Sequence, residues 1–153
     1  MRIENKDFAS LIETWILLET ESAKRAALRR TDEDIEIIQK AQKVFADKVK
    51  SNLSAVEEDL LFHLKIADAS KNSTLKSLLL TIMPDIIKII KQTGLYKNLR
   101  AVSIIIEHEA ILNNIIAREP IKAELAMHQH LKDLVDYSQD FRDRNENGSN
   151  GWH

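Results

Sequence analysis

The sequence predicts an all-α protein, an antiparallel bundle of six to seven helices. Its apolar residues recur at spacings of three and four rather than two, which is the period of an amphipathic helix. Only three glycines and two prolines interrupt the 153 residues, so few positions break a helix. A chain of this length also buries enough surface for one domain with its own core. We therefore expect a single domain over residues 1–144.

The first two helices are marked by their apolar faces and by the turn between them. The first is expected to run from about Phe8 to Arg29. Thr31 then has the side chain of a helix cap, and the three carboxylates at 32–34 lie beside the free amides of a second helix. The apolar face of this second helix carries Ile35, Ile38, Phe45 and Val49.

The next two helices differ in how much of their circumference is apolar. The third follows Ser51-Asn52 and ends in the turn at 68–72. Its inward face carries Val56, Leu60, His63 and Ala67. The fourth, expected from Leu75 to Lys91, is apolar on most sides. Such a helix needs its own core and a second partner, so we expect a homodimer.

Two further helices complete the bundle. The fifth is expected from Tyr96 to Arg118, and the sixth follows Pro120 and extends to about Arg142. Residues 145–153 are rich in asparagine, glycine and serine and have little to bury. We expect them to form a flexible tail.

Charge and composition exclude several classes of function. The formal net charge is −2, from 22 basic and 24 acidic residues, so the chain lacks the basic excess that phosphate-backbone binding needs. There are no cysteines, which excludes disulfides, thiolate metal sites and thiol nucleophiles. Residues 1–7 contain no basic segment followed by an apolar stretch, and no run of 18 apolar residues occurs in the sequence. We expect a cytoplasmic protein with no membrane partner.

Three histidines are in phase with the apolar faces of three different helices. His63 lies on the third predicted helix, His108 on the fifth and His130 on the sixth, and Asp59 precedes His63 by one helical turn. An unpaired carboxylate in the interior is costly. A divalent transition metal bound by Asp59, His63, His108 and His130 would satisfy all four groups. The spacing therefore predicts a buried metal site.

The alternative is that these histidines are only packed in the core. An inward histidine is commonly hydrogen-bonded to a neighbour without binding a metal. His128 and His153 do not share the inward phase, and we expect both to be solvated.

Four separated blocks of the sequence match a known signature in order and spacing. Residues 59–63 match D-x-x-x-H, residues 69–72 match an ASGN turn with lysine for glycine, residues 107–112 match EHRAIL, and residues 127–131 match MRRHL. Over about residues 8–140 the chain thus resembles the FCD (FadR C-terminal-like) domain, the effector-binding domain of GntR-family transcription regulators.

The resemblance implies a helical bundle around a buried divalent ion. Zinc is the metal expected first, with nickel or manganese as alternatives, and the ligands match Asp59, His63, His108 and His130. A small organic acid is expected to bind at the metal, which anchors the acid and does not catalyse a reaction. Effector binding would be coupled to the spacing of two DNA-reading heads in a homodimer.

Three residues are candidates for ligand binding: Arg100, Trp15 and Asn72. Trp15 stands where the family commonly has an arginine that holds an acidic ligand, which leaves the effector class open. Arg100 can reach an anionic ligand from two turns before His108, although an arginine near a helix start is more often solvated. Asn72 belongs to the matched turn, where capping a helix is the alternative role.

The winged helix-turn-helix that precedes such domains has no counterpart in this sequence, since the match begins within about ten residues of Met1. The chain is therefore either a standalone domain or a domain excised at the usual linker, and the position favours excision. DNA is expected as a partner only through that missing part.

Two other functions compete with this interpretation. Di-iron enzymes on helical bundles need Glu-x-x-His motifs, and none occurs here. Glu107 and Glu109 flank His108, but on a helix they should point away from it, which leaves no general base. We therefore expect no enzyme. The second competitor is a helical dimerisation module without metal.

Overall fold

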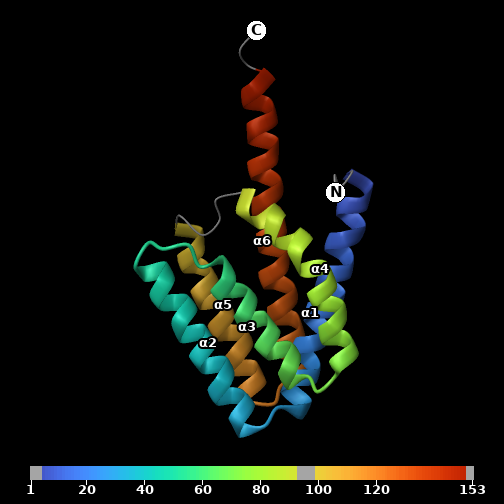
Figure 1. Cartoon of the computed structure of the whole chain (residues 1–153), viewed down its shortest axis with the longest axis vertical. Helices are drawn as coiled ribbons and strands as arrows, with labels where there is room; N and C mark the ends of the chain where they lie inside the picture. The colour runs from blue at the N-terminus through green and yellow to red at the C-terminus, as the bar shows by residue number, and fades with distance from the viewer. Residues whose placement is uncertain (1–4, 93–98, 151–153) are drawn as a thin grey trace.

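The computed structural model describes residues 5–92 and 99–150, and that part of the chain forms six α-helices without a β-strand (Figure 1). The helices are α1 (Asn5–Arg29), α2 (Asp32–Lys50), α3 (Val56–Ala69), α4 (Ser73–Gln92), α5 (Leu99–Ile116) and α6 (Pro120–Asn150). The predicted all-α class is confirmed. The expected start of the fifth helix at Tyr96 lies outside the described residues.

The helices pack around one core. α1 lies along α6, α5 packs against α6 and α2, and α3 contacts α1 and α2. α4 lies on α1 and α3 (Figure 1). The largest fully buried side chains come from α2 to α6: Phe45, Phe62, Ile38, Ile66, Leu79, Ile86, Ile104, Ile111, Ile115, Met127 and Leu131. The core is therefore bounded by several helices, and polar side chains that point into it meet partners from different parts of the sequence.

The turn before α2 has the predicted cap. The Thr31 hydroxyl accepts a hydrogen bond from the Asp34 amide at 3.0 Å, and the Asp34 carboxylate accepts one from the Thr31 amide at 2.8 Å. This reciprocal pair is a capping box. The capping box fixes where α2 begins, directly after the turn that ends α1.

The turn between α3 and α4 is also capped. Asn72 accepts a hydrogen bond from the Leu75 amide at 3.0 Å, so this candidate ligand-binding residue caps α4. Lys71 has a φ of 57°, in the left-handed region that glycine adopts most easily. Its ammonium group lies 2.7 Å from the Asp34 carboxylate, which helps to hold this turn against the start of α2.

The C-terminal end differs from the sequence prediction. α6 continues to Asn150, beyond the expected end near Arg142, so residues 145–150 are helical where a tail was expected. Adding residues to an existing helix avoids the unfavourable nucleation step, which accounts for helix in a polar segment. This end of α6 extends past the other helices (Figure 1).

α4 buries one face and exposes part of another. Leu75, Leu79, Met83, Ile86 and Ile90 are buried, whereas two further leucines at 78 and 80 are about half exposed. Within the described ranges, no helix combines the length and apolar character needed to cross a membrane.

Candidate metal centre

The four residues predicted to bind a metal lie together in the interior. Asp59 and His63 come from α3, His108 from α5 and His130 from α6. Each offers one ligand atom, and these atoms all lie within 4.8 Å of one another. All four side chains are buried. The i, i+4 spacing on α3 places its two groups on one turn, and the packing of α5 and α6 supplies the others.

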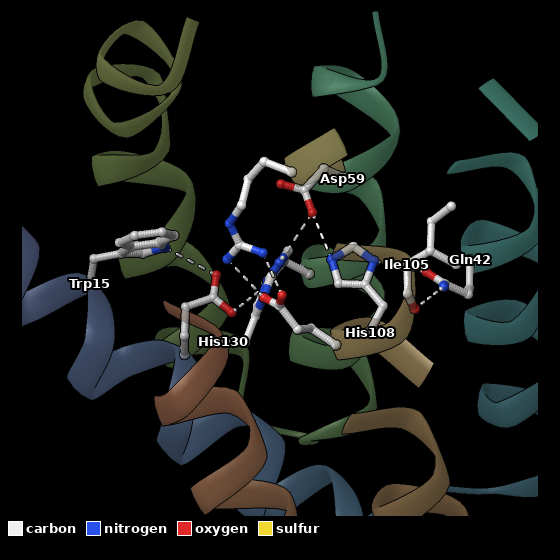
Figure 2. A network of polar contacts seen from close by, with 10 residues as sticks. Trp15, Gln42, Asp59, Ile105, His108 and His130 are labelled. Carbon is white, nitrogen blue, oxygen red and sulfur yellow. Dashed lines mark hydrogen bonds and ion pairs between the residues drawn. The ribbon is translucent and has the colours of Figure 1, made fainter. Parts of the chain in front are cut away.

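On one side of the centre, a carboxylate of α1 orients His63. Nδ1 of His63 lies 2.8 Å from Oε2 of Glu19. Since an ionised carboxylate only accepts hydrogen bonds, Nδ1 is the donor and Nε2 is directed to Asp59, 3.4 Å away. The indole N–H of Trp15 donates to the other Glu19 oxygen at 3.3 Å (Figure 2). Trp15 is therefore buried beside the centre and holds Glu19 in place.

On the opposite side, a neutral amide orients His108. The Gln42 amide nitrogen donates to the Ile105 carbonyl at 3.1 Å, which leaves Oε1 of Gln42 to accept from Nδ1 of His108 at 2.8 Å (Figure 2). Phe62 stacks on the imidazole with ring centroids 4.0 Å apart. Nε2 of His108 consequently carries its lone pair toward Oδ1 of Asp59, at 2.8 Å.

His130 is oriented by the carboxylate of Glu107, which is itself paired with Arg100. Its Nδ1 lies 2.7 Å from Oε1 of Glu107, and Arg100 contacts both oxygens of that carboxylate. Glu107 was expected to point away from His108 and so to leave the site without a base. It does face away from His108 along the helix, but it thereby faces His130 on the neighbouring α6. Arg100 is mostly buried in this contact, with 15% of its side chain exposed, and is not a solvated surface charge.

The donor set fits a divalent transition metal. Among the described residues, the buried Nε2 atoms of His108 and His130 have no hydrogen-bond donor as a partner. A lone pair of His108 and a carboxylate oxygen of Asp59 at 2.8 Å repel each other unless a proton or a cation lies between them. In a tetrahedral site, zinc bonds of about 2.0–2.2 Å place ligand atoms about 3.4 Å apart, so shifts of roughly 1 Å within the cluster would complete a site. Imidazole nitrogen suits zinc or nickel, and carboxylate oxygen suits manganese.

The two sides of the centre have opposite electrostatics in the metal-free protein. Burial lowers the pKa of His63, but the charges of Glu19 and Asp59 outweigh it and raise that pKa to about 10. Burial lowers the pKa of His108 to about 3, against the opposing effect of Asp59. Burial alone would raise the pKa of Asp59, yet the charge of His63 holds it well below its usual value. Without metal, His63 therefore carries the proton that bridges two carboxylates.

Two histidines lie outside the metal centre, and two residues that support it were not predicted. His128 is exposed, as expected, and His153 lies outside the described residues. Gln42 was missed, although a glutamine between Ile38 and Phe45 on an inward face was a usable signal. Glu107 was considered only beside His108, and its contact with His130 was missed because that partner is on another helix.

A pocket adjoins the Asp59 and His63 side of the centre. It lies between α1, α3 and α4, with Trp15 on one wall and Ile86, Ile87 and other apolar residues on the rest. Asp59 and His63 form its polar wall. A ligand in this pocket would therefore reach the ligand atoms of α3. Neither Arg100 nor Asn72 is among the residues that line it.

Comparison with known proteins agrees with this architecture. Residues 10–133 match the family model of the FCD domain. The HTH-type transcriptional regulator LutR of Bacillus subtilis (strain 168) is 31% identical over 147 residues, which cover 94% of this chain and 67% of that protein. The resemblance drawn from the four sequence blocks is confirmed. This chain belongs to the FCD domain family of GntR-type transcription regulators.

Proposed function

We propose that this chain is the effector-sensing domain of a FadR-subfamily regulator and that it binds a small organic acid at a buried divalent metal. Zinc is the metal proposed first, with nickel or manganese as alternatives. The observation that carries the proposal is the convergence of three buried imidazoles, each held at Nδ1 by an acceptor, on the carboxylate of Asp59.

The acceptors at Nδ1 leave each of the three histidines with Nε2 as its metal-binding atom. Glu19, Gln42 and Glu107 fix the ring orientation and the tautomer, so that all three Nε2 atoms serve as ligands. The metal would supply a Lewis-acidic anchor for an effector carboxylate. Without it, the negative charges of Asp59 and Glu19 would repel such an anion. We therefore expect the acid to bind only to the metal-loaded protein.

The alternatives fit the site less well. A packed-histidine module would pair Nε2 of His108 and His130 with donors. In the described part of the chain, Nε2 of His130 is buried without a hydrogen-bond partner, and Nε2 of His108 faces the carboxylate oxygen of Asp59. For an enzyme, a bound water would need a base. The carboxylates next to the ligands in the described part of the chain, Glu19 and Glu107, are both engaged as histidine acceptors.

We also propose a cytoplasmic homodimer that contacts DNA through a separate winged helix-turn-helix. The half-exposed Leu78 and Leu80 on α4 support a subunit contact there, and the net charge of −2 disfavours DNA binding by this chain itself. Light scattering tests the dimer. A mass of two chains is expected, and a mass of one chain would refute it.

The central test of the proposed function compares chelator-treated protein with the same protein reloaded with zinc. Acetate, lactate and pentanoate are added at equal ionic strength, with chloride as the control, and the thermal midpoint is followed. We expect at least one acid to raise the midpoint of the zinc-loaded protein only. Equal shifts with and without zinc, or no shift with any acid, would contradict an effector anchored by the metal.

A further inference from the structure

The pocket beside the metal centre has one polar wall, and the rest of it is apolar. Asp59 and His63 supply its polar atoms, and those atoms are directed to the proposed metal. The opposite walls are formed by side chains such as Leu60, Ile86 and Ile87. The pocket is narrow and partly open to solvent, which limits its occupant to a small molecule.

Trp15 contributes a surface without a spare donor. Its single N–H is used by Glu19 at 3.3 Å (Figure 2), so the indole borders the pocket as an apolar ring. No lysine or arginine is among the described residues that line the pocket. Arg100 lies on the other side of the centre, where it pairs with Glu107 beside His130.

We infer that the effector is a monocarboxylate with an apolar alkyl or aryl body. This inference rests on the proposed function, because the carboxylate is held by the metal while the body lies against Trp15, Ile86 and Ile87. A second carboxylate on the ligand would be desolvated against these side chains without a cation to pair with it. Each methylene that enters the pocket should instead tighten binding by about four-fold.

The experiment is a calorimetric titration of the zinc-loaded protein with two acids of equal chain length. Pentanoate ends in a methyl group where glutarate has a second carboxylate. We expect pentanoate to bind more tightly by about ten-fold or more, and the affinity to rise from propionate to pentanoate. Equal or tighter binding of glutarate that depends on zinc would overturn the apolar ligand class. The proposal that an organic acid binds at the metal would still hold. If zinc-loaded protein binds neither acid, both proposals fall.

A pair of variants tests whether this pocket holds the body of the acid. Ile87→Lys introduces a cation on the pocket wall, whereas Ile89→Lys places the same charge two residues away on α4, outside the residues that line this pocket. Both positions are partly exposed, so both variants should fold. We expect Ile87→Lys to shift the preference toward glutarate by about ten-fold, with Ile89→Lys behaving like the unmodified chain. The same preference in both variants would overturn the placement.

Discussion

The His63 side and the His108 side of the centre use the same residue type in opposite ways. His63 is held by a carboxylate, its pKa is raised to about 10, and it borders a pocket. His108 is held by a neutral amide, lies between Phe45 and Phe62, and has its pKa lowered to about 3. Burial lowers the pKa of both rings, and only at His63 do the charges of Glu19 and Asp59 outweigh it.

This contrast also separates two tasks. The His108 side is buried against two phenylalanine rings, and it presents a neutral imidazole that needs no change of protonation to bind a metal. The His63 side must lose a proton when the metal enters, and it is the side that a ligand in the pocket reaches. The following predictions test the two sides against each other.

The largest effect on the charged side is expected from Glu19→Gln. The variant keeps the shape of the side chain but removes the carboxylate that raises the pKa of His63 and strengthens it as a ligand. Loss of such a supporting group typically lowers metal affinity by about 10- to 100-fold. Competition with a chromophoric zinc chelator measures this affinity. An unchanged affinity would show that Glu19 only fills space.

On the neutral side, Gln42→Leu should lower the affinity for zinc by about ten-fold, the lower end of the same range. It also leaves the Nδ1–H of His108 and the Ile105 carbonyl without their partner, and an unsatisfied buried group costs about 1–3 kcal/mol. Urea unfolding of the metal-free variant measures that loss. If the variant is as stable as the unmodified chain, the orientation given to His108 is not imposed by Gln42.

The two opposite pKa shifts predict a stability maximum near pH 6.5 for the metal-free protein. Between about pH 3 and 6.5, His108 is protonated in the unfolded chain but not in the folded chain. The free energy of unfolding therefore rises with pH in this range. Between pH 6.5 and about 10 the folded chain keeps the proton on His63 that the unfolded chain loses, so stability falls.

On either side of the maximum, the free energy of unfolding changes by at most about 1.4 kcal/mol per pH unit. Urea midpoints of chelator-treated protein from pH 5 to 9 measure the change on both sides, and Glu19→Gln should reduce it on the alkaline side. Stability that is constant from pH 7 to 9 would contradict a protonated His63.

The smallest effect is expected from Arg100→Met, behind His130. Arg100 helps to lower the pKa of Glu107, but the hydrogen bond from His130 remains in the variant. We expect a loss of zinc affinity of less than ten-fold. Arg25→Met, which breaks a surface pair with Glu21, is the matched control and should leave the affinity unchanged. Equal effects of the two variants would remove Arg100 from the site.

The helices and the ligand set were predictable because both depend on local periodicity. The 3.6-residue period alone places His63, His108 and His130 inward, and Thr31 with its following carboxylates marks a helix start. The supporting residues were not predictable in the same way. Whether Glu107 reaches His130 depends on how α5 is rotated against α6, which no single helix reveals. The composition of residues 145–150 likewise gave no sign that α6 would continue through them.

The most direct test of the account is the metal content of protein purified without a nickel column. The unmodified chain is compared with His108→Ala, His130→Ala and the control His128→Ala, which alters an exposed histidine two residues from His130. We predict about one transition-metal ion per chain in the unmodified protein and in the control, and its loss in the other two variants. An unmodified protein without metal, with all variants folded, would contradict the account and leave a helical dimerisation module with packed histidines.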